Sequence, residues 1–142
     1  MKTLVLLVAA AMAPSASQSG GTPIAGSWTA QFEGRTFLRL ELKAVNGTIT
    51  GGMSMGDFEV DGQGEVRRAD EAPRDLKPLL DVAYRAATLT FSRRDVTETD
   101  RFELRLLEAG HAELRFLLND ADRKDLAASG IPDPKPIRLT RH

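Results

Sequence analysis

Side chains that commonly catalyse reactions are scarce in this sequence. It contains no cysteine and only two histidines, His111 beside a turn signal and His142 at the end of the chain. Neither histidine has the spacing of a metal site or of a Ser–His–Asp arrangement. No glycine-rich phosphate loop connects a strand to a helix. We therefore expect no enzymatic activity, no metal site and no bound cofactor.

A run of alternating carboxylates partly resembles a calcium-binding loop. Asp57, Glu59 and Asp61 occur at every second position, and Gly62 follows them. In an EF-hand loop a bidentate glutamate occupies the last position, but the corresponding residue here is Arg68. We interpret the run as the solvated face of a strand, with no metal bound.

One charged pair falls on the core side of an expected hairpin. A turn at Val96-Thr97 pairs Phe91 with Phe102 and places Arg93 opposite Asp100. Charges near a strand end would lie at the rim of a barrel. There they could bind the polar end of a ligand, or they could form a salt bridge that closes the barrel. Both interpretations remain open.

Hairpin signals predict the strands that position these residues. Asn46-Gly47 is typical of a two-residue hairpin loop, and Glu108–Gly110 of a three-residue loop with glycine in the left-handed position. Both registers place apolar residues opposite apolar residues, as a half-buried hairpin requires. The first pairs Leu38 with Met55, Leu40 with Met53, Leu42 with Gly51 and Ala44 with Ile49; the second pairs Phe102 with Phe116, Leu104 with Leu114 and Leu106 with Ala112.

The other segments are assigned from turn and capping signals. Gly56-Asp57 is expected to make a further tight turn that continues the sheet, and residues 65–78 to form a loop. A strand is expected over 79–84, a short helix from Asn119 or Asp120 through Ser129, and a last strand over 137–140. The predicted fold is all-β: an antiparallel up-and-down barrel of eight or nine strands with one short helix before the last strand.

The N-terminal residues have the pattern of a secretory signal. Lys2 precedes an apolar run, 4–13, and small residues follow it. The run is shorter than the roughly 20 residues that span a bilayer. We expect a cleaved signal peptide over 1–17, a flexible lead-in over 18–24 and one barrel domain over 25–142. The protein would then be secreted or periplasmic, and the processed form would have no membrane span.

The charge balance limits the choice of partners. The chain carries 19 basic and 20 acidic residues, a net charge of −1 at pH 7. A chain so nearly neutral lacks the positive potential that binds nucleic acid or an anionic membrane surface. We expect neither as a partner.

Three short motifs and the element order resemble the lipocalin and calycin group. Gly26-Ser27-Trp28 is similar to the Gly-x-Trp motif of the group, and Thr99-Asp100-Arg101 is similar to its Thr-Asp-Tyr, with arginine in place of tyrosine. Arg123 or Arg141 would match the arginine of the third motif. The resemblance is to small secreted bacterial barrels of unknown function. It implies that Trp28 closes the barrel base beneath an arginine, and that the barrel binds a small molecule.

These observations predict a binding protein for a small, mostly apolar ligand. Ala30 and Gly51 are small members of the inward-facing set, and we expect any cavity to lie beside them. One alternative is an exported protein-binding or inhibitor module that acts through its loops, above all 67–77. The other is a purely structural, filled barrel. The expected ligand-binding residues are Phe32, Met53, Phe91, Arg93, Asp100 and Phe102, and the expected residues of the barrel base are Trp28, Arg123 and Arg141.

Overall fold

The computed structural model describes residues 23–96 and 98–142. The expected signal peptide, 1–17, and most of the expected lead-in lie outside the described residues. The lead-in was expected to end at residue 24, but Ile24 has no exposed surface and belongs to the core. No helix in the described residues is long and apolar enough to cross a membrane.

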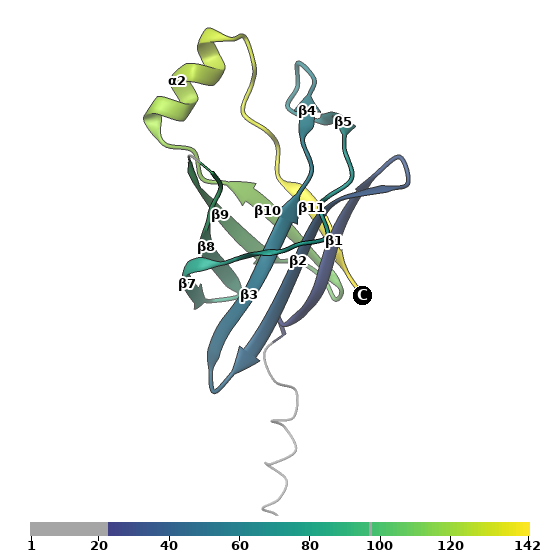
Figure 1. Cartoon of the computed structure of the whole chain (residues 1–142), viewed down its shortest axis with the longest axis vertical. Helices are drawn as coiled ribbons and strands as arrows, with labels where there is room; N and C mark the ends of the chain where they lie inside the picture. Colours follow the sequence, from purple (N-terminus) through teal and green to yellow (C-terminus); the bar gives the residue numbers. More distant parts are fainter. Residues whose placement is uncertain (1–22, 97) are drawn as a thin grey trace, which may run out of the picture.

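Nine antiparallel strands form one sheet that curves into a nearly closed barrel (Figure 1). This confirms the predicted fold class. In sheet order the strands are β6 (Lys77–Pro78), β3 (Thr48–Met55), β2 (Arg35–Val45), β1 (Gly26–Phe32), β11 (Ile137–Arg141), β10 (His111–Phe116), β9 (Thr99–Leu106), β8 (Thr88–Arg94) and β7 (Leu80–Arg85).

Two long-range features complete the barrel. The first strand, β1, pairs with the last, β11, through Trp28↔Arg141 and Thr29↔Thr140. On the other side, the short β6 pairs with β3, and the chain then passes directly into β7. The seam between β3 and β7 is therefore bridged by the chain itself rather than by a full ladder of hydrogen bonds.

The hairpin registers agree with the sequence prediction. Leu40 pairs with Met53, and Leu104 pairs with Leu114. Asn46 has a φ of 52° and Gly47 a φ of 79°, so both central turn residues adopt the left-handed conformation that Asn-Gly tolerates. Because side chains alternate along a strand, these registers place the apolar set inside the barrel.

The expected turn at Gly56-Asp57 is wrong. β4 (Phe58–Val60) leaves the barrel and pairs with β5 (Val66–Ala69) in a separate two-stranded sheet. A Cβ atom at Gly56 would lie 2.1 Å from the Asp70 carbonyl oxygen. Glycine is therefore needed where the returning chain crosses β3, and not for a tight hairpin.

Residues 65–78 also differ from the expected loop, since they contain β5 and β6. The chain between these strands is hydrogen-bonded to the barrel. The Ala72 amide donates to the Thr36 carbonyl oxygen (2.9 Å), and the Ser54 hydroxyl donates to the Pro73 carbonyl oxygen (2.7 Å). The segment 67–77, expected above to be the main contact loop of a protein-binding module, is therefore anchored to the barrel at Ala72 and Pro73.

Large apolar side chains fill the barrel interior. Phe116, on the inward face of β10, is only partly buried because it lies near the end of the barrel. The apolar residues at most 1% exposed are Ile24, Trp28, Leu38, Leu40, Met53, Leu89, Phe91, Phe102, Leu104, Leu114 and Leu139, together with Ala112.

The predicted helix is α2 (Asp120–Ala128), which stands beyond one end of the barrel (Figure 1). Asn119 is its N-cap: the Asn119 side chain accepts from the Asp122 amide, and the Asp122 carboxylate accepts from the Asn119 amide. None of the helical residues is buried. We call the end of the barrel nearest to α2, β4 and β5 the mouth.

Candidate binding site at the barrel mouth

A row of phenylalanine rings crosses the barrel just below the mouth. The ring centroids of Phe37 and Phe58 are 6.0 Å apart, those of Phe58 and Phe116 5.7 Å, and those of Phe116 and Phe102 5.2 Å. Phe91 stacks on Phe102 at 5.4 Å. Phe91 and Phe102 are fully buried, whereas Phe58 and Phe116 are partly exposed. Since Phe37 is buried as well, the row is buried at both ends and reaches the solvent at its middle members, Phe58 and Phe116.

An open pocket of about 400 Å³ lies on the exposed part of this row. We call it the mouth pocket. Its apolar side is formed by Met55, Phe58 and Phe116. Its polar side is formed by one arginine and three aspartates: Arg93, Asp57, Asp95 and Asp100. The pocket thus combines an aromatic surface with a charged rim.

Arg93 is the most unusual residue of the mouth pocket, because it is a cation with only 9% of its surface exposed. It lies opposite Asp100 on β9, as the sequence predicted. Its Nη2 is 3.7 Å from the Asp100 Oδ2, too long for a hydrogen bond, and its Cζ is 6.0 Å from the centroid of the Phe102 ring. The Arg93 Nε is buried with no hydrogen-bond partner among the described residues.

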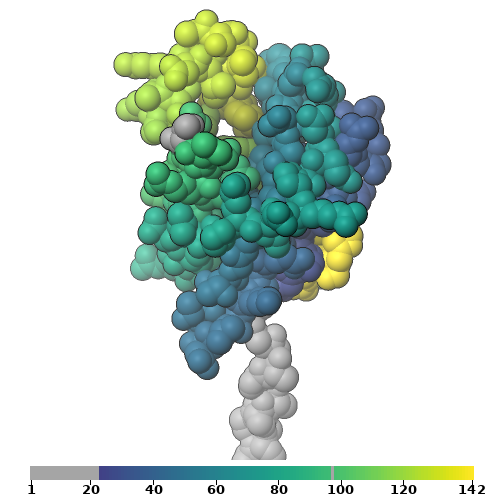
Figure 2. Space-filling view, in the orientation of Figure 1, coloured from purple at the N-terminus to yellow at the C-terminus, as the bar shows by residue number. Residues whose placement is uncertain are grey.

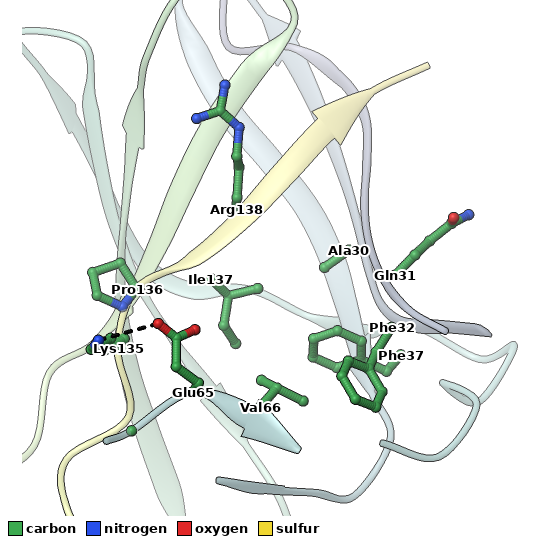
Figure 3. Close-up of a pocket in the computed structure, with 11 residues that line it drawn as sticks. Ala30, Gln31, Phe32, Phe37, Glu65, Val66, Lys135, Pro136, Ile137 and Arg138 are labelled. Carbon is green, nitrogen blue, oxygen red and sulfur yellow. Dashed lines mark hydrogen bonds and ion pairs between the residues drawn. The ribbon is translucent and has the colours of Figure 1, made fainter. Parts of the chain in front are cut away.

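Phe32 lines a different pocket, which we call the side pocket and which has a volume of about 370 Å³ (Figure 3). The side chains of Phe32, Phe37, Val66 and Ile137 gather around it, while Gln31 and Arg138 point away. The Glu65 carboxylate and the Lys135 ammonium group, 3.2 Å apart, form an ion pair at its edge. Since Phe37 lines the side pocket and Phe58 the mouth pocket, the contact between these two rings lies between the pockets.

A third depression, the helix groove, adjoins the mouth pocket because both are lined by Phe58. Its apolar lining also includes Leu126 of α2 and Ile131, which is 43% exposed. Figure 2 shows the opening between α2 and the β4 region. The two depressions therefore meet at Phe58, which contributes to both.

The structure brings only part of the expected ligand site together. Arg93 and Asp100 line the mouth pocket and Phe32 lines the side pocket. Met53, Phe91 and Phe102 are fully buried, and they line neither of these pockets nor the helix groove. Phe91 and Phe102 lie beneath the site, where Phe102 contacts Phe116, and Met53 belongs to the core.

Gly51 does not mark free space, contrary to the expectation from its size. A Cβ atom at this position would lie 1.9 Å from the Glu41 carbonyl oxygen on β2. The neighbouring backbone occupies the volume that a side chain would need. The cavity expected beside Gly51 is therefore replaced by a close approach of two strands.

Trp28 is buried toward the other end of the barrel, and an arginine lies over its ring as expected. That arginine is Arg141, whose Cζ is 5.4 Å from the Trp28 ring centroid. The indole Nε1 donates to the Ile24 carbonyl oxygen (2.9 Å), and Arg141 donates to the Pro23 carbonyl oxygen (2.6 Å). Arg123 lies instead on α2, where it is exposed, so it does not contribute to the barrel base.

Asp57, Phe58 and Asp95 belong to the mouth pocket but were not predicted as site residues. Asp57 and Phe58 were missed because a tight turn was expected at Gly56-Asp57. A hairpin there would have kept both residues within the sheet. Asp95 follows β8 by one residue. Its proximity to Arg93 in the sequence was an available signal, since both lie at the same strand end.

The carboxylate run 57–65 has a structural role at the tip of the β4–β5 hairpin. The Asp61 carboxylate accepts hydrogen bonds from the amides of Gln63 (2.8 Å) and Glu65 (3.1 Å). These two bonds lower the pKa of Asp61 below its ordinary value, because they favour the ionised form. Within residues 23–96 and 98–142, no group of three acidic or histidine side chains could hold a metal ion.

The chemical groups of the mouth pocket are carboxylates, one guanidinium group and aromatic rings. Its described lining contains no serine, histidine or lysine, and it offers an arginine, carboxylates and aromatic rings instead. No protein-family model, curated protein or solved structure matches this chain.

Proposed function

We propose that this protein is an exported, lipocalin-like binding protein that takes a small, mostly apolar ligand at its barrel mouth. The ligand would lie on Phe58 and Phe116, with its polar end toward Arg93. The proposed site is at the mouth of the barrel and not in a central cavity, because apolar side chains fill the interior.

The observation that carries the proposal is the incomplete environment of Arg93. Burial of a guanidinium group is unfavourable unless acceptors compensate for the lost hydration. The Asp100 carboxylate, its ion-pair partner, is 3.7 Å away, and the Arg93 Nε has no described hydrogen-bond partner. Because Arg93 lines the mouth pocket, an acceptor group on a ligand would compensate this buried charge.

The apolar surface beside Arg93 supports the same proposal. The mouth pocket, about 400 Å³ in volume, lies within the range of small-molecule sites. The partly exposed rings of Phe58 and Phe116 lose further contact with water when a ligand covers them, at roughly 25 cal/mol per Å². An apolar ligand body would therefore bind here more favourably than a fully polar one.

Exposed apolar residues near the mouth keep an exported protein-binding module as the second candidate. Val96, three residues after Arg93, is 86% exposed, and Ile131 of the helix groove is 43% exposed. A protein partner could cover both. This candidate would require a larger contact area than the mouth pocket and would not require Arg93 to meet a small ligand.

Thermal unfolding with a panel of fatty acids and small aromatic compounds tests the proposal. A ligand at 100 times its Kd should stabilise the protein by about 2.7 kcal/mol and raise Tm. Phe58→Ala and Arg93→Gln should each reduce this shift. Arg94→Gln is the matched control, because Arg94 is exposed on the same strand and does not line the pocket. Absence of any shift, or a shift unchanged in both variants, would exclude the mouth as the binding site.

A further inference from the structure

We infer that the mouth pocket selects a small zwitterion, namely a free α-amino acid with an apolar side chain. This inference rests on the proposed function and specifies its ligand. It follows from two requirements of the polar rim that no singly charged ligand meets.

The first requirement is set by the carboxylates. Asp57, Asp95 and Asp100 line the pocket with a single cation, Arg93. When all four groups are ionised, the rim carries a net charge of −2. A ligand whose only charged group is a carboxylate or a phosphate would meet this excess of negative charge at close range. The rim therefore favours a ligand that brings a positive charge.

The second requirement is set by Arg93. Arg93 is 9% exposed and lines the pocket, and its Nε has no described partner. A ligand carrying only an ammonium group would leave this cation with Asp100 alone, at 3.7 Å. It would also place a second positive charge near it. Arg93 therefore favours a ligand that brings an acceptor, and a carboxylate is the strongest one.

An α-amino acid carries both groups on one carbon atom. Its carboxylate would bind Arg93, and its ammonium group would face Asp57 and Asp95, which approach from the β3–β4 connection and from the end of β8. Its side chain would then lie on Phe58 and Phe116. The ligand is neutral as a whole, so it adds no net charge to the rim.

Three compounds with the same ring separate these contributions: L-phenylalanine, 3-phenylpropionate and 2-phenylethylamine. The second lacks the ammonium group, and the third lacks the carboxylate. In titration calorimetry we expect L-phenylalanine to bind at least about tenfold more tightly than either, since one charge-assisted hydrogen bond contributes about that much.

Two variants should change the relative affinities for these three compounds in opposite ways. Arg93→Gln should weaken L-phenylalanine and 3-phenylpropionate by about tenfold and improve 2-phenylethylamine, because its ammonium group no longer lies near a second positive charge. Asp57→Asn should weaken L-phenylalanine and 2-phenylethylamine and improve 3-phenylpropionate. Arg94→Gln and Asp75→Asn are the controls, because both residues are exposed and lie outside the pocket lining. If Arg93→Gln does not fold, Asp57→Asn still decides, because Asp57 is exposed.

Equal or tighter binding of 3-phenylpropionate or 2-phenylethylamine would overturn the inference. The inference is also overturned if none of the three compounds binds while a fatty acid still raises Tm and Arg93→Gln reduces that shift. This result would leave the proposed function intact. If no compound of either panel binds, both the inference and the proposed function fail.

Discussion

Arg93 is a buried cation, and burial of a poorly paired charge is expected to cost stability. Its side chain is 11% exposed, and its ion-pair partner, Asp100, is 40% exposed. Replacement of a buried, poorly paired cation by an apolar residue of similar volume is often neutral or stabilising. Removal of Arg93 would leave Asp100 in contact with water, so no buried charge would remain without a partner.

We therefore predict that Arg93→Met is at least as stable as the unmodified protein, and that its binding of an amino acid is lost. Urea unfolding should give an equal or higher midpoint, with Arg94→Met as the exposed control. A loss of more than about 1 kcal/mol would show that Arg93 stabilises the barrel, and the interpretation as a rim salt bridge would then be favoured.

Gly51 shows the opposite situation, in which the smallest side chain is needed by the fold itself. We predict that Gly51→Ala lowers the free energy of unfolding by about 1–3 kcal/mol, because its Cβ would collide with the Glu41 carbonyl oxygen at 1.9 Å. Gly62→Ala is the control, since no described residue other than its chain neighbours lies within 4 Å of the Cβ position there. Urea midpoints that coincide for the two variants would contradict this explanation.

These two residues also indicate how much of the site could be predicted. The pairing of Arg93 with Asp100 followed from a local turn and the two-residue period of a strand. The role of Gly51 did not follow, since glycine is compatible both with free space and with a close backbone approach. Only the three-dimensional position of Glu41 distinguishes the two, and no local pattern contains it.

At the scale of elements, the β4–β5 hairpin is attached to the chain that leads into β11. The Lys135 amide donates to the Gly64 carbonyl oxygen (3.0 Å), and the Lys135 side chain pairs with Glu65. Asp61 shapes the hairpin tip through its bonds to the Gln63 and Glu65 amides. The tip therefore depends on an ionised Asp61.

We predict that acid loosens this tip. The folded-state pKa of Asp61 is lowered, so its contribution is present at neutral pH and is lost as the pH falls through the lowered pKa. In NMR spectra, the Gln63 and Glu65 amide signals should move with a midpoint below about 3.9, the ordinary aspartate value. Asp61→Ala should abolish the movement. A midpoint at or above that value would contradict the assigned hydrogen bonds.

The helix α2 is expected to be the least stable element, because none of its residues is buried. We predict that Asn119→Ala destabilises the helix by about 1 kcal/mol through loss of its cap. Hydrogen exchange of the α2 amides should accelerate, while the urea midpoint of the barrel stays the same. A barrel midpoint that falls with the helix would show that the two unfold together.

Elements that depend on short-range signals were predicted well. The Asn46-Gly47 turn, the α2 helix and the last strand required only neighbouring residues. The β4–β5 sheet was missed because Gly56 fits a hairpin locally but serves a chain crossing at Asp70. Tertiary contacts override the local preference there.

For the whole molecule, the barrel class was predictable and its closure was not. Alternating patterns indicate how many strands share one apolar face, which is sufficient to suggest a barrel. The pairing of β1 with β11 and the two-residue β6 join parts of the chain that are distant in sequence. Such contacts leave no periodic pattern in either partner.

Export also concerns the whole molecule. We predict that the exported protein begins between Pro14 and Gly20, since the apolar run 4–13 is followed by small residues. N-terminal sequencing of protein recovered outside the cytoplasm checks this. Retention of Met1 on that material would contradict it.

The neighbouring positions of β1 and β11 have a mechanical consequence. Because the two strands are antiparallel, the beginning of β1 and the end of β11 lie at the same end of their shared ladder, with Trp28 beside Arg141. A pulling force applied at these two points would unzip the β1–β11 ladder. Its hydrogen bonds would be loaded one after another, rather than all together in shear. The barrel should therefore yield to stretching at low force, with β11 peeling away first, however high its thermal stability.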